Sequence, residues 1–245
     1  HLIHSIYSIN RWWPMLLHRL DSDFIKYLID NHVEAGDRLP TLNEMSRDLG
    51  ISTGKLREQL EVARSLGFVS VKTRTGIQRE PFNFAPAVLI ALLFSLGTGE
   101  TQFAQFSELR QAIEKYMWHD AVVSLTPTDK TELRRLVNLA WRKLRDQPAH
   151  VPNGEHRQFH LKIYSHLDNP FVQGLLSAYW DAYEASELTR FVNYQYWVDV
   201  WTFHEQIVDA LDANDFDRGL TLLTDHFSLL PTIPIAGTWP TGTSG

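Results

Sequence analysis

The stretch TLNEMSRDLGISTGKLREQLEVARSLG, residues 41–67, decides the fold of the N-terminal part of the chain. Thr41 and Glu44 stand three residues apart, as in a capping box, where each side chain pairs with a backbone amide of the first turn. They predict a helix over Leu42–Leu49. Gly50 is a typical residue for ending such a helix.

A second helix is predicted directly after this turn. Ser52 is a favoured N-cap residue, and the helix that it caps ends before Gly67. The apolar stripe of this helix follows helical spacing and consists of Leu56, Leu60 and Ala63. Two short helices joined through residues 50–52 form a helix-turn-helix.

The flanking segments complete a winged helix. Asp23–His32 repeats apolar residues at helical spacing and predicts a first helix. Val69–Gln78 contains a basic, Gly-containing turn at residues 72–76, which predicts a β-hairpin, or wing. The order of three helices and a hairpin predicts a winged helix-turn-helix domain at residues 22–80, after an N-terminal extension at 1–21.

The remaining sequence is predicted to be all helical. Pro81 and Pro86 bound a segment that cannot be a continuous helix, so residues 81–86 form the expected linker. An all-α bundle of six or seven helices follows at 87–232, with a flexible tail at 233–245. Breaker residues divide this bundle into helices over 87–96, 101–124, 128–146, 153–167, 170–191, 195–212 and 216–230. The predicted fold class is mainly α.

Composition excludes several classes of protein. The 245 residues include no cysteine, which excludes a disulfide framework, a thiolate zinc finger and a cysteine nucleophile. The longest apolar run, Val88–Phe94, is far shorter than the roughly 20 residues of a membrane span, so we expect a cytoplasmic protein with no membrane partner. Residues 38–79 carry eight basic and four acidic side chains, whereas residues 86–245 carry 12 and 19. This asymmetry favours a polyanionic partner for the N-terminal domain.

The second helix of a helix-turn-helix enters the major groove of DNA by its N-terminal residues. Arg57 lies opposite the apolar stripe, where it can bind guanine or phosphate. The wing would reach the phosphates or the adjacent groove, and the first helix can contact phosphate through its N-terminus. The predicted contacts with a double-stranded DNA operator are Thr41, Asn43, Ser52, Thr53, Lys55, Arg57, Lys72, Arg74 and Gly76.

This region resembles the winged-helix signature of GntR-type bacterial transcription regulators. The matching residues are Gly36-Asp37-Arg38-Leu39-Pro40, Leu49-Gly50-Ile51-Ser52, Leu56-Arg57-Glu58-Gln59-Leu60 and Leu66-Gly67-Phe68-Val69. The family usually places Glu-Arg after Leu-Pro-Ser and Ser-Arg at the start of the recognition helix, where this chain has Leu42-Asn43 and Ser52-Thr53. Of the usual arginine contacts only Arg57 remains. The resemblance implies DNA binding but no particular operator sequence.

Four of the 11 histidines occupy inward positions on predicted helices. His156 and His160 are four residues apart, so both project from one face of their helix, and His204 and His226 interrupt the apolar stripes of later helices. A single buried histidine is usually a hydrogen-bonded core residue, whereas His-x-x-x-His on a helix can grip a divalent ion. Four converging imidazoles with nothing bound would suffer desolvation and mutual repulsion, which favours a shared metal ion.

Arg110 stands within the apolar stripe of the predicted helix 101–124. A buried arginine needs an anionic partner. One interpretation is a structural ion pair, for example with Glu114, and the other is a clamp for the carboxylate of an organic-acid effector whose other end binds the metal. Tyr164 continues the strip of His156 and His160 and is a candidate wall residue of that effector site.

The histidine region resembles the FCD effector domain of FadR-type GntR regulators. The matching residues are Phe159-His160, Asp168-Asn169-Pro170-Phe171, Phe203-His204-Glu205-Gln206-Ile207 and Asp225-His226. In that domain an Asp-x-x-x-His pair and two further histidines often hold a divalent metal, and an arginine in the helix of Arg110 resembles a carboxylate clamp. His156 occupies the position of the aspartate, which implies a site of four histidines. Such a nitrogen-rich site favours Zn²⁺ or Ni²⁺ over Mg²⁺ or Ca²⁺.

Together these features predict a DNA-binding transcription regulator, not an enzyme, whose metal-containing helical domain senses a small organic acid. A homodimer is expected, because one recognition helix covers few base pairs. Two alternatives stay open. A metal-dependent hydrolase would need a general base near the ion, and no glutamate is well placed on the histidine faces. The second alternative is a protein-interaction module in which the metal site is structural and which has lost DNA binding.

Overall fold

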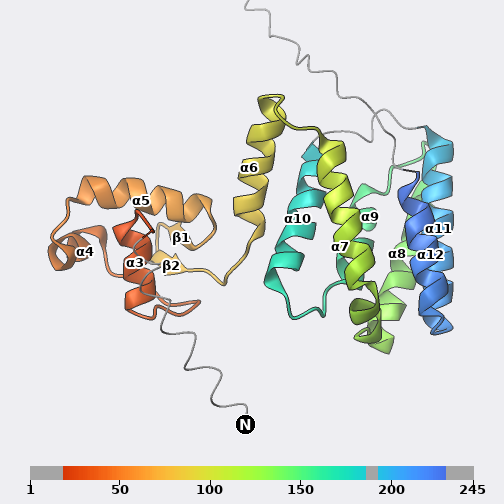
Figure 1. Ribbon diagram of the computed structural model, residues 1–245, viewed down its shortest axis with the longest axis horizontal. Coiled ribbons are helices and arrows are strands. Elements are labelled where there is room, and N and C mark those ends of the chain that lie inside the picture. The colour runs from red at the N-terminus through yellow and green to blue at the C-terminus, as the bar shows by residue number, and fades with distance from the viewer. Residues whose placement is uncertain (1–18, 186–192, 230–245) are drawn as a thin grey trace, which may run out of the picture. The chain divides into compact units, whose positions relative to one another are not determined.

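The structure is a computed structural model that describes residues 19–185 and 193–229. The chain divides into two compact units, residues 1–87 and 88–245. The described part contains ten α-helices and one two-stranded antiparallel sheet (Figure 1). The predicted fold class is confirmed: the chain is mainly α, with a winged helix-turn-helix followed by a helical domain.

The first unit is the winged helix-turn-helix. Its elements are α3 (Asp23–Asp30), α4 (Leu42–Leu49), α5 (Thr53–Ser65), β1 (Val69–Lys72) and β2 (Gly76–Arg79). In the hairpin, Val69 lies opposite Arg79 and Lys72 opposite Gly76. One apolar cluster holds the three helices and the hairpin together, formed by Phe24, Leu28, Leu39, Met45, Leu56, Leu60, Ala63, Val69 and Ile77.

Both predicted helix caps form in this unit. The Thr41 amide donates to the Glu44 carboxylate over 2.7 Å, and the Thr41 hydroxyl accepts from the Glu44 amide over 3.3 Å. Gly50 ends α4 with a φ of +67°, a left-handed conformation that a β-carbon would disfavour. The Ser52 hydroxyl accepts from the Lys55 amide over 3.2 Å and starts α5. Local capping chemistry therefore fixes the turn between α4 and α5.

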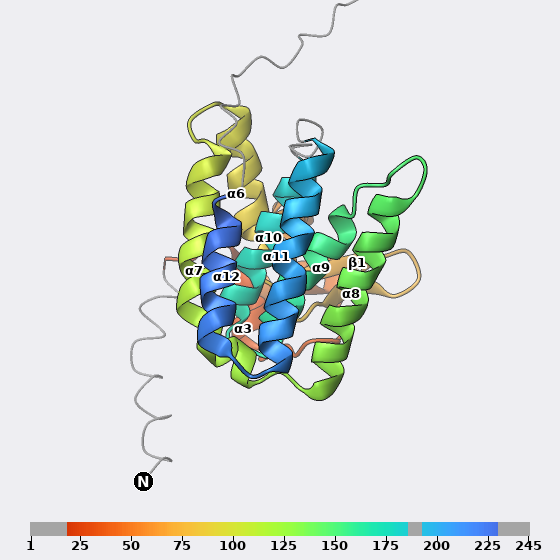
Figure 2. The same cartoon turned by 90° about the vertical axis from the view of Figure 1, so that its right-hand side faces the viewer.

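The second unit is a bundle of helices. Its elements are α6 (Ala85–Gly97, which begins at the end of the first unit), α7 (Phe103–Val123), α8 (Pro127–Arg145), α9 (Asn153–Ile163), α10 (Pro170–Ala185), α11 (Tyr194–Asp212) and α12 (Phe216–Phe227). Figure 2 shows α7, α12, α11 and α8 side by side in one layer, with α10 and α9 behind them. No helix among the described residues is both long and apolar enough to cross a membrane.

Two helix ends differ from the prediction by three residues or more, and α6 begins at Ala85, inside the segment predicted as the linker. The helix predicted over 153–167 stops at Ile163, because the Ser165 and Leu167 amides donate to carbonyls three residues back, over 3.2 and 3.3 Å, and form turns in place of α-helical bonds. Asn169 then caps α10, accepting from the Val172 amide over 3.2 Å. The helix predicted over 216–230 ends at Phe227, with Ser228 as its C-cap. The predicted end at residue 191 lies outside the described residues.

Candidate functional site

The four predicted histidines meet in the core of the helical unit. His156 and His160 come from α9, His204 from α11 and His226 from α12. Each is at most 1% exposed. One ring nitrogen from each lies within 4.8 Å of the corresponding nitrogens of the other three. Three helices thus bring four imidazoles to a common point.

The spacing of these nitrogens suits a metal ion. His160 Nε2 and His204 Nε2 are 3.2 Å apart. A tetrahedral site with metal–nitrogen bonds of about 2.0 Å has edges of about 3.3 Å, so this pair already has the separation of two ligands on one ion.

Several of the ring nitrogens have no other partner among the described residues. Both nitrogens of His156 and the Nδ1 atoms of His204 and His226 are buried and make no hydrogen bond within the part of the chain that the structure describes. Buried nitrogens of this kind are normally paired. Burial, reinforced by neighbouring histidines, holds the pKa of His156, His204 and His226 well below the ordinary value. The rings are therefore neutral, the form that binds a metal, and the four residues fit such an ion.

A buried carboxylate supports His160 from the opposite side of the ring. Glu114, on α7, is fully buried, and its Oε2 lies 3.2 Å from His160 Nδ1. Arg110 Nη2 lies farther from the same atom, at 3.4 Å. Because an ionised carboxylate only accepts hydrogen bonds, the shorter contact favours a proton on Nδ1, which leaves the Nε2 lone pair facing the other histidines. Sequence reasoning missed this role, since it searched for a carboxylate only on the histidine helices.

Arg110 pairs with the same carboxylate. Its Nε donates to Glu114 Oε1 over 2.9 Å and its Nη2 to Oε2 over 3.0 Å. Burial raises the pKa of Glu114, but Arg110 and His160 outweigh it and hold the pKa at about 2. The Tyr164 hydroxyl donates to the Glu114 carbonyl over 2.9 Å. Of the two interpretations of Arg110, the ion pair with Glu114 is thus present in the structure.

Aromatic rings surround the histidines. Trp180, Trp197 and Trp201 lie with ring centroids 4.6, 5.9 and 6.3 Å from that of His156. Their indole N–H groups are buried and donate to no other described residue. The Arg110 guanidinium also lies 4.8 Å from the ring centroid of Tyr179. The site is therefore a low-dielectric environment that contains indole N–H donors with no partner among the described residues.

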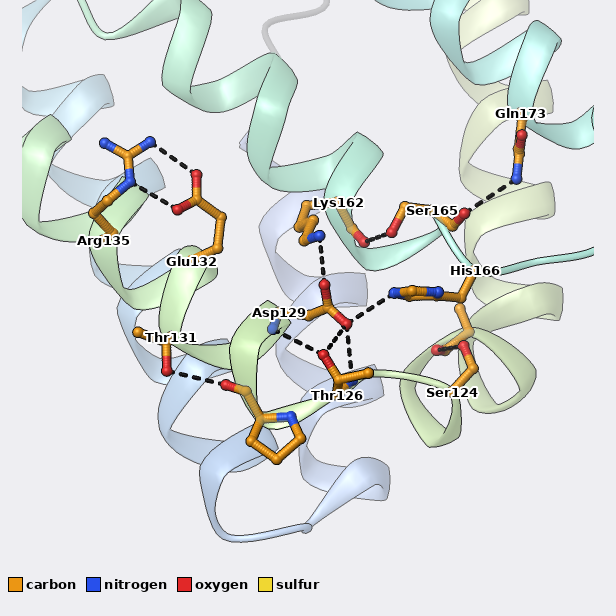
Figure 3. A network of polar contacts seen from close by, with 12 residues as sticks. Ser124, Thr126, Asp129, Thr131, Glu132, Arg135, Lys162, Ser165, His166 and Gln173 are labelled. Carbon is orange, nitrogen blue, oxygen red and sulfur yellow. Dashed lines mark hydrogen bonds and ion pairs between the residues drawn. The ribbon is translucent and has the colours of Figure 1, made fainter.

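A second polar network anchors the end of α9 (Figure 3). Asp129, in the first turn of α8, accepts from the Thr126 hydroxyl over 2.6 Å and from His166 Nε2 over 2.8 Å, and it pairs with Lys162. Its pKa is held well below the ordinary value, chiefly by Lys162. This network fixes the C-terminal end of the helix that carries His156 and His160.

The predicted DNA contacts fall into four groups in the first unit. Thr41 and Ser52 use their hydroxyls as helix caps. Lys55 pairs with Asp23 over 2.7 Å. The half-buried residues are Thr53 and Gly76, and the exposed ones are Asn43, Arg57, Lys72 and Arg74.

Arg38 is a basic residue that the predicted set left out. It is exposed, and its Nε lies 3.6 Å from the place where a β-carbon on Gly76 would stand. A side chain at position 76 would therefore meet this guanidinium beside the wing. Its place in the Gly36–Pro40 motif was the available signal.

Comparison with known proteins agrees with this architecture. The model of the FCD domain family matches residues 105–229, just over half of the chain. A candidate regulatory protein of the L-lactate dehydrogenase operon from Escherichia coli (strain K12) is 23% identical over 220 residues, covering 86% of this chain and 83% of its own length. The uncharacterized HTH-type transcriptional regulator YcbG of Bacillus subtilis (strain 168) is 25% identical over 201 residues, 78% of each chain.

Among solved structures, a GntR protein of Streptococcus agalactiae aligns with a TM-score of 0.61 at 16% identity, covering 84% of this chain and 93% of its own. That likeness shows a shared fold. Together with the domain match and the two regulator relatives, it assigns the winged helix and the bundle to one known architecture. The chain is a ligand-responsive transcription regulator and belongs to the GntR family of regulators that carry an FCD domain.

Proposed function

We propose that His156, His160, His204 and His226 hold a divalent metal ion through which this regulator senses a small organic acid. The observation that carries the proposal is the convergence of four buried, neutral imidazoles whose nitrogens lie within 4.8 Å of one another. An all-nitrogen donor set favours Zn²⁺ or Ni²⁺ over oxygen-seeking Mg²⁺ and Ca²⁺. When bound, the metal would supply a Lewis acid that attracts an anionic oxygen.

The charge of the site favours an anionic effector. The four neutral rings and the Arg110–Glu114 pair contribute no net charge, so a divalent ion would stand uncompensated in a low-dielectric core. A carboxylate ligand would reduce that charge. We propose Arg110 and Tyr164 as effector contacts, with the effector sharing the guanidinium with Glu114. The name of the Escherichia coli relative makes L-lactate the first acid to try.

The first unit would bind a double-stranded operator. We propose residues 22–80 as the DNA-binding domain, 81–86 as the linker and 87–232 as the effector domain. Thr53 and Arg57 would face the groove, Asn43, Lys55, Lys72 and Arg74 the phosphates, and Thr41, Ser52 and Gly76 would shape the contacting backbone. A homodimer would present two such domains, and effector binding would change their spacing by favouring one packing of the bundle.

A hydrolase is the weaker alternative. Glu114 is the carboxylate that such an enzyme would need, but Arg110 pairs with it and it faces the Nδ1 side of His160, away from the metal-facing nitrogen. It is therefore poorly placed to take a proton from a metal-bound ligand.

Metal content and DNA binding test the proposal separately. Elemental analysis of the purified protein should find one Zn²⁺ or Ni²⁺ per chain, and a His160→Ala, His204→Ala double variant should lose it. A mobility-shift titration of the metal-loaded protein on DNA, with and without L-lactate and other small acids, should show a changed affinity with one of them. Wild-type protein that takes up no divalent ion would refute the metal site, and equal affinity with every acid tried would refute the sensing.

A further inference from the structure

The composition of α6 does not match its environment. Its sequence, APAVLIALLFSLG, contains no charged residue, and Ser95 is its single polar side chain. A helix that is apolar on all sides is normally buried on all sides. Figure 1 shows α6 beside α10, at the margin of the helical unit, and the described residues of that unit cover only part of its circumference.

The covered and uncovered faces are well defined. Leu89, Leu92 and Leu96 lie on one face and pack against the aromatic cluster of α7 and α10. Ile90 and Phe94 lie on the opposite face and are 48% and 67% exposed. Large apolar side chains gathered on one exposed face mark an interaction site.

We propose that a second copy of this chain packs on this face, with α6 antiparallel to α6 of the partner across a two-fold axis between residues 90 and 91. The inference rests on the homodimer proposed above and assigns its contact surface. The face consists of Ala87, Ile90, Ala91 and Phe94, with Leu93 and Gly97 at its edge.

The order of large and small residues on this face fits a copy of itself. With the axis between residues 90 and 91, each residue n lies opposite residue 181 − n of the partner. Phe94 then lies over the partner's Ala87, and Ile90 over the partner's Ala91. Every layer pairs one large with one small side chain, which lets two helices approach to about 8 Å. The same patch serves both subunits, as a two-fold interface requires.

Charge favours the same occupant. Two copies of an uncharged helix can meet without like-charge repulsion, whereas a polar or charged partner would leave its own groups unpaired against Ile90 and Phe94. A second exposed apolar row on α7, formed by Leu109, Tyr116 and Val123, stands among charged neighbours such as Lys115 and Asp120. It is therefore a less suitable interface and provides a matched control.

Ala91→Glu tests the proposal. Ala91 is exposed, so the substitution leaves the core of the subunit intact. Near the axis, two new carboxylates would face each other, and sedimentation equilibrium of the full chain should show a dimer Kd raised by about 100-fold or more. Val123→Glu, at a site 70% exposed on α7, should leave the Kd unchanged. Circular dichroism and metal content should match wild type in both variants.

Cysteine cross-linking tests the register, because the natural chain has no cysteine. Ala91→Cys places the two thiols beside the axis and should give a disulfide-linked dimer on mild oxidation. Phe94→Cys places each thiol about 10 Å along the helix from its copy, beyond the reach of a disulfide, and should not.

The outcomes separate the two proposals. A wild-type chain that is monomeric would overturn both the homodimer and this surface. A dimer that survives Ala91→Glu, or that dissociates with Val123→Glu instead, would overturn the surface alone. Neither result bears on the metal site, which elemental analysis measures independently.

Discussion

Replacing Glu114 with glutamine should weaken both the fold and metal binding. Glu114→Gln keeps the shape of the side chain but removes the charge that pairs with Arg110 over 2.9 Å, where both side chains are at most 1% exposed. A buried charge left without its partner destabilises a protein by about 3–5 kcal/mol. Each kcal/mol lowers the melting temperature of a unit of this size by about 2–4 °C. We therefore expect a drop of roughly 10 °C.

The same change should lower metal affinity. The carboxylate favours a proton on Nδ1 of His160, whereas an amide can present either a donor or an acceptor to that atom. Loss of such a supporting contact typically reduces metal affinity by about 10–100-fold. Competition with a chelator for Zn²⁺ measures the affinity, and thermal unfolding followed by circular dichroism measures the stability.

Two further variants serve as controls for the effect of Glu114→Gln. Glu132→Gln breaks a pair of the same type with Arg135, but there the carboxylate is 36% exposed, and surface pairs contribute at most about 1 kcal/mol. The double variant Arg110→Met, Glu114→Leu removes both buried charges, so it should recover stability without recovering metal affinity. If Glu114→Gln and Glu132→Gln melt at the same temperature, the reasoning about the buried pair is wrong.

In the metal-free protein, the free energy of unfolding should fall as the pH drops below about 6.5, because burial lowers the pKa of His156, His204 and His226 and the unfolded chain then binds more protons. Urea titrations at about pH 7.5 and about pH 5.5 measure this, and a stability that rises on acidification would contradict it. Arg57→Ala should weaken DNA binding more than Lys55→Ala does, since Lys55 already pairs with Asp23 over 2.7 Å. Mobility shifts at low salt compare the two variants, and the reverse order would argue against the proposed recognition helix. Asp129→Asn should lower the free energy of unfolding by about 2–3 kcal/mol, because its carboxylate accepts from Thr126, Lys162 and His166. A urea midpoint equal to that of wild type would show that this network contributes no stability.

Local chemistry explains why the first unit could be predicted from sequence. The Thr41–Glu44 capping box, the left-handed Gly50 and the Ser52 cap each depend on residues within a few positions of one another. The end of α9 was missed for a local reason as well: the Ser165 amide bonds to the Lys162 carbonyl in a turn, which apolar periodicity does not reveal.

The candidate site was predictable only in part. Helical spacing placed His156 and His160 on one face, and the apolar setting of Arg110 showed that it needed an anion. Its i+4 neighbour Glu114 was a possible partner, but the contact of Glu114 with His160 joins residues 46 positions apart on different helices. No periodicity within a single helix encodes that distance. Only the packing of α7 against the rest of the bundle creates it.

The same packing shows why a metal would change this domain. The four ring nitrogens spread over as much as 4.8 Å, whereas two ligands of a tetrahedral ion with bonds of about 2.0 Å lie about 3.3 Å apart. Binding would therefore draw the four imidazoles closer together, and with them the helices α9, α11 and α12. Close-packed helices respond to such shifts by moving as units. An effector that replaces one metal ligand or adds another would change how closely these helices are drawn together. The metal site would then itself be the switch between two packings of the bundle.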